Sequence, residues 1–415
     1  MTMYLPERVL VSPSGFKESL SAVDVADSIA AGVRRVLPGV RVDLYPVPDG
    51  GEGTVEILAQ RPGTVTHTTK VTGPVGRKVT ATWLEFPDES VAVLEMASAA
   101  GLSLVPRDLR DPTATTTRGV GELIATILDH GVDRIVVGCG DSGTSDGGTG
   151  ALAALGARIL DDEGAEIGAG GGELARAVRI DTANLHPRLG EVEITLACNI
   201  HNVLTGSTGV AQVFGPQKGA TKKQVKQLGK ALNRWADLLT ETFTPDADLH
   251  LGAGSGASGG LGAGLMALGA TARDRFDVLL GDLPSAADLD DLVAGADLVI
   301  TAEGAIDFQT PRGKVPAEIA RRAQATGVPV LALAGSLGKG APQVHEVGIG
   351  AIASIMTVPM ALEDAVRDGR QLLIDAAERA IRLLQLGCAV AGRREEKVRA
   401  LYYSAGSSGA TPVRS

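Results

Sequence analysis

The first part of the chain alternates apolar and amphipathic segments. An apolar run over residues 8–12 is followed by a Pro/Ser/Gly turn, by apolar positions at helical spacing over 22–33, and by a further apolar run over 40–45. This order predicts a strand, a helix and a second strand. The last third of the chain has the same alternation, with strands predicted over 297–301, 329–334 and 351–357 and helices over 315–325 and 362–384. Such alternation is typical of a parallel sheet flanked by helices.

The middle of the chain has a different pattern. Thr-rich alternation predicts antiparallel or mixed strands over 64–71, 79–84 and 92–95, before apolar runs of the parallel type over 134–138 and 194–198. We therefore predict an α/β protein of two domains. Residues 1–60 and 288–386, from both chain ends, form a Rossmann-like parallel-sheet domain, and residues 61–287 form an inserted second α/β domain. Periodicity is lost after about residue 386, so residues 387–415 are predicted to form a flexible tail.

Composition and charge narrow the range of functions. The chain has 415 residues, which is enough for about two to three domains. Its net charge of −10 argues against attachment to nucleic acid or to an anionic membrane surface. Cys139, Cys198 and Cys388 are too few and too scattered for a disulfide framework or a CxxC metal site. Because no apolar run is typical of a signal or of a membrane span, the expected location is the cytoplasm. The sequence gives no indication of oligomeric state.

Candidate ligand-binding residues follow predicted strands, where open α/β sheets place their ligands. Lys17 lies in the turn after the first strand, at a helix N-terminus suited to a phosphate or a carboxylate. Asp49 and Glu52 lie in the glycine-rich segment 48–54, where Glu52 can alternatively cap a helix. Glu303 and Asp307 are predicted just past a buried strand, a position at which acids hold Mg²⁺ or cap the next helix.

Two segments contain the spacing GxGxxG. Residues 138–143 follow a strand and precede acidic residues at 161 and 162, as in a dinucleotide-binding fingerprint. Further glycines at 147, 148 and 150 postpone the helix that a pyrophosphate needs, so dinucleotide binding is only an alternative. Residues 252–262 lack the lysine and hydroxyl residue of a P-loop. Anion-binding loops with paired carboxylates, in a sequence without Cys/His spacing typical of a metal site, favour phosphoryl transfer.

The chain also resembles a known family through motifs that occur in a fixed order. The motifs are FKESLS (16–21), DGGEGT (49–54), TTTRG with GEL (115–123), DGG (146–148), VFGPQKGA (213–220), residues 257–262 and residues 303–314. Between about residues 8 and 384 the chain is similar to the bacterial type 1 glycerate kinase family. The resemblance implies a two-domain α/β kinase with a cleft between the domains. It implies the use of ATP and Mg²⁺ to phosphorylate D-glycerate to 2- or 3-phosphoglycerate.

Charge and loop placement assign roles within this activity. Cationic side chains are predicted to neutralise phosphate or substrate carboxylate, and acids to organise Mg²⁺ and substrate hydroxyls. The predicted substrate-binding residues are Asp49, Glu52, Arg118, Asn202 and Lys218. The predicted catalytic residues are Lys17, Asn199, His201 and Asp307. The predicted metal ligands are Glu303 and Asp307, and the glycines predicted to cover nucleotide are Gly254, Gly256, Gly259 and Gly260.

The chain departs from the family pattern at several positions. Ser14 and Asn199 each stand where the family has an aspartate, and Ala305 stands where it has an arginine. If residue 199 is the position of the family's base, His201 is a candidate substitute, since a neutral imidazole can accept a hydroxyl proton near pH 7. These changes leave three alternatives open: a kinase of another small hydroxy acid, an inactive nucleotide-binding homologue, and an NAD(P)-dependent oxidoreductase built on residues 138–143.

Overall fold

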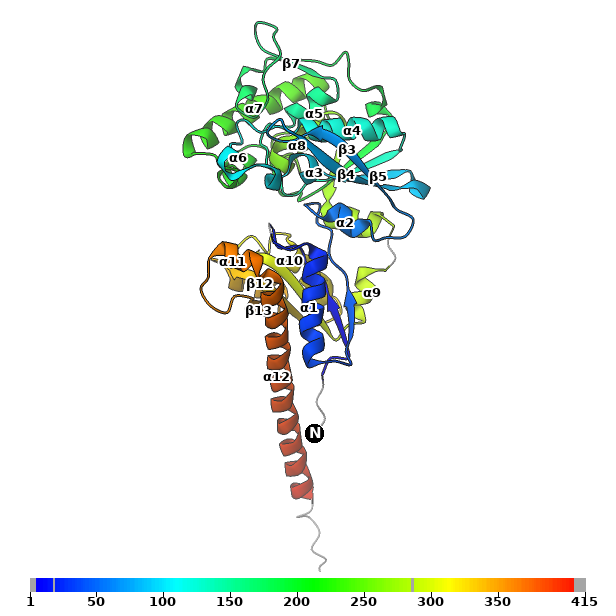
Figure 1. The fold of residues 1–415 in the computed structure, drawn as a ribbon, viewed down its shortest axis with the longest axis vertical. Helices are drawn as coiled ribbons and strands as arrows, with labels where there is room; N and C mark the ends of the chain where they lie inside the picture. The colour runs from blue at the N-terminus through cyan, green and yellow to red at the C-terminus, as the bar shows by residue number, and fades with distance from the viewer. Residues whose placement is uncertain (1–4, 18, 285–286, 407–415) are drawn as a thin grey trace, which may run out of the picture. The chain divides into compact units, whose positions relative to one another are not determined.

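Figure 1 shows the computed structural model of the chain, which describes residues 5–17, 19–284 and 287–406. The chain divides into two compact units. Met1–Val47 with Ala287–Ser415 forms one, the terminal unit, and Pro48–Ala286 forms the other, the inserted unit. Residues 48–60, which we expected in the first domain, belong to the inserted unit. The reason is that α2 (Thr54–Leu58) buries Val55 and Leu58 among apolar side chains of that unit's sheet.

The terminal unit contains a five-stranded parallel sheet in the order β13-β12-β11-β1-β2. The strands are β1 (Arg8–Val11), β2 (Arg41–Leu44), β11 (Leu298–Ile306), β12 (Val330–Leu337) and β13 (Ala351–Ser354). The helices are α1 (Ala22–Val36), α9 (Leu289–Ala294), α10 (Val315–Gln324), α11 (Leu362–Arg367) and α12 (Gly369–Gly406). The predicted parallel sheet built from both chain ends is thereby confirmed.

Helices cover this sheet because successive strand residues point to opposite faces. Val9, Val11 and Ile300 are buried in one cluster with apolar residues of α1 and α12, two helices that lie side by side in Figure 1. Leu10 and Val299 are equally buried and point to the other face. Helical structure also continues past residue 386, where we expected a flexible tail, to Gly406; residues 407–415 lie outside the described part of the chain.

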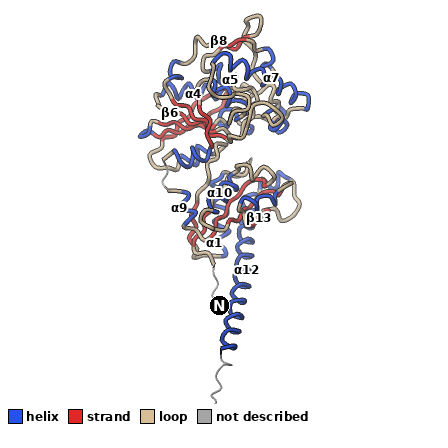
Figure 2. The backbone as a smooth tube through the Cα atoms, turned by 180° about the vertical axis from the view of Figure 1, so that it is seen from behind, coloured by secondary structure: helices blue, strands red, loops and turns tan. Residues whose placement is uncertain are grey.

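The inserted unit contains a six-stranded mixed sheet in the order β10-β9-β6-β5-β4-β3, drawn in red in Figure 2. Its strands are β3 (Val65–Thr72), β4 (Lys78–Phe86), β5 (Val91–Glu95), β6 (Arg134–Gly138), β9 (Glu193–Cys198) and β10 (Thr271–Asp274). The first three pair antiparallel, and β5, β6, β9 and β10 run parallel, so the carboxyl ends of these four lie along one edge. A separate antiparallel pair joins β7 (Arg158–Leu160) to β8 (Arg179–Asp181).

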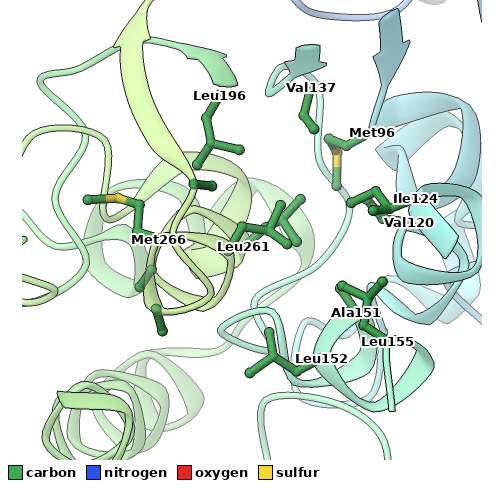
Figure 3. Close-up of a cluster of buried hydrophobic side chains, with 14 of the residues drawn as sticks. Met96, Val120, Ile124, Val137, Ala151, Leu152, Leu155, Leu196, Leu261 and Met266 are labelled. Atoms are coloured by element: carbon green, nitrogen blue, oxygen red, sulfur yellow. The ribbon is translucent and has the colours of Figure 1, made fainter. Parts of the chain in front are cut away.

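One face of this mixed sheet carries the larger core of the unit. Figure 3 shows side chains from β6 and β9 meeting those of three helices, among them Val137, Leu196, Ile124, Leu152 and Leu261. The helices of the inserted unit, besides α2, are α3 (Ala97–Ala100), α4 (Arg118–His130), α5 (Thr149–Ala154), α6 (Val210–Phe214), α7 (Lys222–Phe243) and α8 (Ala257–Ala267). The opposite face is covered by α2 and by the helical turn Asp277–Asp282.

Among the residues that the structure describes, no helix combines the length and the apolar character needed to cross a membrane.

Candidate active site

Lys17 lies at the point where the strand order of the terminal sheet reverses. β2 lies on one side of β1, and β11 and the later strands lie on the other. Open α/β sheets bind their ligands at such a switch point, outside the carboxyl ends of the strands. The loop after β1 follows β11, since the Ser14 N–H donates to Ala302 O at 3.0 Å. The backbone of Lys17 therefore passes over Gly304, where a Cβ would lie 3.8 Å from Lys17 N.

Glu303 lies within a strand, and the prediction that it follows one is wrong. β11 continues to Ile306 because β12 pairs with it as far as that residue, with Glu303 opposite Ala334. The Glu303 Oε1 atom is 2.9 Å from Lys314 Nζ, and this nitrogen is also 3.6 Å from Asp307 Oδ1. One cation thus contacts both acids. Lys314 lies in a motif of the sequence, but we assigned it no role.

Two opposing effects act on the carboxyl group of Glu303. Burial raises the pKa of Glu303 above its usual value, and the ammonium groups of Lys314 and Lys17 offset this only in part. The Thr310 hydroxyl is 3.4 Å from Glu303 Oε2 and accepts the Asp307 N–H at 3.1 Å. Neither acid caps α10, whose N-cap residue is Lys314. The terminal unit thus holds two acids and two cations at its switch point.

In the inserted unit, the segment 48–53 rests on the glycine-rich loop after β6. The Gly140 N–H donates to Gly50 O at 2.8 Å, and the Glu52 N–H donates to Asp141 Oδ2 at 3.1 Å. The segment 48–53 passes the carboxyl ends of β6 and β9, since a Cβ at Gly50 would lie 3.0 Å from Ala197 O. The glycines of the GxGxxG spacing therefore admit a neighbouring backbone. The helix after this loop, α5, begins only at Thr149, too late for a dinucleotide-binding fingerprint.

Replacing Gly140 with alanine is expected to displace the segment 48–53. A Cβ at Gly140 would lie 2.6 Å from Gly51 N, closer than packed atoms approach, so the segment that carries Asp49 and Glu52 must move. A shift of about 1 Å in a catalytic loop can cost roughly 100-fold in rate, and we expect Gly140→Ala to lose at least about tenfold in kcat/KM. Steady-state kinetics would test this. Gly190→Ala is the matched control, because a Cβ there meets no atom within 4 Å; equal activity of the two variants would contradict the role of Gly140.

Glu95, at the carboxyl end of β5, binds the backbone at the end of the segment 48–53 and at the start of α2. Its Oε2 accepts the Val55 N–H at 3.0 Å and its Oε1 accepts the Gly53 N–H at 3.3 Å. These bonds satisfy the N-terminus of α2, whose N-cap residue Gly53 has no side chain to do so. Glu52 therefore does not cap α2, as one interpretation of the sequence held. Burial raises the pKa of Glu95 to about 7, and the charges of Glu52 and Asp141 act in the same direction.

Glu95 is expected to make stability depend on pH. Its pKa is about 7 in the folded chain and 4.5 without burial, so the folded state binds the proton more tightly. This contribution is fully present below about pH 4.5 and is lost as the pH rises through about 7, and it amounts to at most about 3 kcal/mol. In Glu95→Gln, thermal unfolding between pH 5 and 8 should show a flatter dependence of Tm on pH than in the wild type. Glu56→Gln, exposed on α2, should keep the wild-type slope; an unchanged slope in Glu95→Gln would refute the assignment.

The acids of the segment 48–53 differ in exposure. Asp49 is half-buried and its Oδ1 accepts the Gly51 N–H at 2.9 Å, while Glu52 is exposed. Arg275 Nη1 donates to Asp49 O at 3.2 Å and holds the start of the segment. Asp141, to which we gave no role, has a left-handed backbone with φ of 51°, an uncommon conformation outside glycine that is found at functional loops.

The loop after β9 lies at the same edge of the sheet. Asn199 Oδ1 accepts the His201 N–H at 3.0 Å, so this side chain shapes the turn. The Asn202 N–H donates to Asn199 O at 3.1 Å, and Asn202 O accepts the Gly256 N–H at 3.0 Å. His201 is exposed. Its role as a base stays a prediction.

Lys218 is buried, although we expected it to contact substrate. Only 2% of the residue is exposed, and its Nζ donates to Ser142 Oγ at 2.8 Å and to Thr144 O at 2.5 Å. Burial lowers the pKa of Lys218 to about 7, and the nearby charge of Asp146 acts against this. Lys218 therefore holds the loop that follows Asp141.

Arg118 lies at the start of α4, beside the end of β3. Its Nε is 3.2 Å from Glu122 Oε1, and Glu122 Oε2 accepts the Thr72 N–H at 2.7 Å. Three strands separate β3 from β9 in the sheet, so the strand order does not bring Arg118 next to Asn202.

The glycines predicted to cover nucleotide are buried in the inserted unit. A Cβ at Gly254 would lie 2.6 Å from Ala272 Cβ, and one at Gly260 would lie 2.7 Å from Leu204 Cδ1. Gly256 and Gly259 would collide with the backbone at Val203 and at Thr144. These positions need glycine for packing, and contact with nucleotide stays a prediction.

Comparisons with known proteins agree on one family. Residues 9–385 match the glycerate kinase family. A glycerate kinase of Bacillus subtilis (strain 168) is 44% identical over 363 residues, which cover 86% of this chain and 92% of that protein. A glycerate 2-kinase of Escherichia coli (strain K12) is 40% identical over 387 residues, covering 93% and 100%. A crystal structure from Salmonella typhimurium LT2, assigned to glycerate kinase 2, superimposes with a TM-score of 0.71 at 40% identity and covers 92% of this chain and 98% of that one.

Proposed function

The chain belongs to the glycerate kinase family, and from this membership we propose that it transfers the γ-phosphoryl group of ATP to a hydroxyl of D-glycerate. The match over residues 9–385 carries this proposal. Because the Escherichia coli relative is a glycerate 2-kinase, we propose 2-phosphoglycerate as the product. The fold offers the positions such a reaction needs, with charged side chains at the carboxyl ends of parallel strands in both units.

We propose that Glu303 and Asp307 hold Mg²⁺. Their chemistry fits, since carboxylate oxygens are the ligands that Mg²⁺ prefers. Their placement supports this role, because both acids lie beside one cation, the ammonium group of Lys314, at 2.9 and 3.6 Å. Bound Mg²⁺ would neutralise charge on the phosphate oxygens.

Lys17 and Lys314 would supply the remaining positive charge. The transferred phosphoryl group carries charge on three oxygens in a loose transition state, so that fixed cations contribute more than a strong base does. Lys17 lies where a ligand of the terminal sheet is expected, and its charge already reaches Glu303. Lys314 stands beside Ala305, with Nζ 3.5 Å from Ala305 O. A cation is therefore present next to the position where the family has arginine.

We propose that Asp49 and Glu52 bind the hydroxyls of glycerate, with Asn202 and His201 on the neighbouring loop. Carboxylates and amides accept hydrogen bonds from hydroxyl groups, and both loops lie at the carboxyl edge of the mixed sheet. Lys218 is proposed as a positioning residue, because its ammonium group contacts the loop 142–144. Arg118 remains a candidate for the carboxylate of the substrate.

Release of ADP by the purified protein with ATP, Mg²⁺ and D-glycerate tests this function. We expect turnover with D-glycerate to exceed turnover with lactate, tartronate and malate. Activity confined to one of the other acids would favour a kinase of a different hydroxy acid, the alternative that the residues at 14, 199 and 305 leave open.

A further inference from the structure

Two histidines and a glutamate converge on one side of the inserted unit. His67 lies on β3, Glu85 on β4, and His130 is the last residue of α4. The Nε2 atoms of His67 and His130 are 2.7 and 3.1 Å from the same atom, Glu85 Oε2. One ligand atom from each of the three residues lies within 4.8 Å of the other two. The sequence gives no sign of this cluster, because its members are far apart along the chain.

The fold fixes each member of the cluster. His67 pairs directly with Trp83 across the β3–β4 register, so His67 and Glu85 are diagonal neighbours on one face of the sheet. The His67 ring stacks on the Trp83 ring with centroids 4.1 Å apart and planes inclined by 15°. His130 meets the His67 ring edge-on at 5.1 Å, and Gly131, in the left-handed region, ends α4 at this point.

We propose that His67, Glu85 and His130 form a binding site for a transition metal ion of the Zn²⁺ type. Two imidazole nitrogens with one carboxylate are a common zinc ligand set. Ligand atoms about 2.0–2.1 Å from a tetrahedral ion lie roughly 3.3 Å apart. The two nitrogen–oxygen distances, 2.7 and 3.1 Å, lie near this value, and the two nitrogens lie within 4.8 Å of each other. In the metal-bound form each imidazole would coordinate the ion through the Nε2 lone pair and carry its ring proton on Nδ1.

The surroundings suit a cation that exchanges with solvent. The C-terminus of α4 carries partial negative charge, which stabilises a positive ion beside His130. The side chains of His67, Glu85 and His130 are 27%, 17% and 40% exposed. Metal can therefore enter, and water can complete the coordination. Because the three ligands come from β3, β4 and α4, bound metal would tie the edge of the sheet to the helix that packs on it and so raise Tm.

Titration of the full chain with ZnCl₂ after chelator treatment, without Mg²⁺ or nucleotide, tests the proposal. We expect one saturable site in calorimetry, a rise in Tm, and visible bands of tetrahedral cobalt when Co²⁺ replaces Zn²⁺. His130→Gln, at an exposed position that should not disturb folding, should weaken binding at least about tenfold and abolish the cobalt bands. His67→Gln should do the same.

His186→Gln and His250→Gln are the matched controls. Each of these histidines faces a single carboxylate, Asp129 or Asp237, at 3.1 Å, and neither belongs to the cluster of His67. Their replacement should leave zinc affinity and the cobalt spectrum unchanged. The proposal is overturned if the wild type shows no saturable binding, or if His130→Gln binds zinc as tightly as the wild type does. Neither result would bear on phosphoryl transfer, since the readouts do not involve turnover.

Discussion

Lys17→Met is expected to lower kcat for glycerate phosphorylation by about 10²- to 10³-fold, the usual cost of removing one group that stabilises transition-state charge. Methionine keeps much of the length of the side chain and removes its charge. The effect should fall on kcat more than on the KM for glycerate, because the ammonium group is proposed to act on charge that develops during transfer. Steady-state kinetics with ATP and D-glycerate would measure both constants.

Lys226→Met provides the control for this variant. Lys226 is exposed on α7 in the inserted unit, so its replacement removes one positive charge without touching the switch point of the terminal sheet. It should retain wild-type kcat. If Lys17→Met stayed within about threefold of the wild type while its Tm was unchanged, Lys17 would have no part in the transfer.

Asp146→Asn is expected to destabilise the inserted unit by roughly 3 kcal/mol. Asp146 is fully buried, and its Oδ2 accepts the N–H and the hydroxyl of Thr117 at 2.8 and 2.9 Å and the Gly150 N–H at 3.2 Å. Its Oδ1 accepts the Gly148 N–H at 3.2 Å. An amide group at either position places donor against donor, and each buried donor left unpaired costs about 1–3 kcal/mol.

The loss should appear as a Tm lowered by about 6–12 °C, since a domain of this size shifts by roughly 2–4 °C per kcal/mol. Asp162→Asn is the control. Asp162 is exposed in the turn that follows β7, so its replacement should leave Tm unchanged. Differential scanning calorimetry would measure the Tm of both variants. A Tm for Asp146→Asn within about 2 °C of the wild type would show that the network around this carboxylate does not support the fold.

The parallel sheets could be predicted because buried strands are continuous apolar runs. The end of β11 could not, since the segment from Glu303 to Ala305 is polar or small and resembles a loop. Only pairing with β12 keeps it a strand, and strand pairing over such separations leaves no local pattern. Similarly, the prediction of a flexible tail after residue 386 rests on loss of apolar periodicity. Loss of this periodicity indicates loss of burial and not loss of the helix. The residues that follow are mostly good helix formers, and α12 continues.

In the candidate site, too, the sequence predicted some features, whereas others depend on tertiary contacts. The GxGxxG spacing of residues 138–143 suggested a dinucleotide-binding fingerprint as one alternative, whereas in the structure these glycines admit the backbone of the segment 48–53. Charge identified Lys218, yet only packing reveals that its ammonium group is turned into the protein. Glu95 was missed because it ends a buried strand and carries no motif. The one sequence feature that could have indicated Glu95 is its place as a carboxylate at the carboxyl end of an apolar strand.

The most direct test of the central claim is phosphorus NMR of the product formed from ATP, Mg²⁺ and D-glycerate. We predict a new phosphate monoester signal, matched by release of ADP, that is split into a doublet by the single proton on carbon 2 of 2-phosphoglycerate. A triplet from two methylene protons would place the phosphate on the 3-hydroxyl and contradict the proposed product. If ATP remained unchanged and no monoester signal formed, the protein would not be a glycerate kinase.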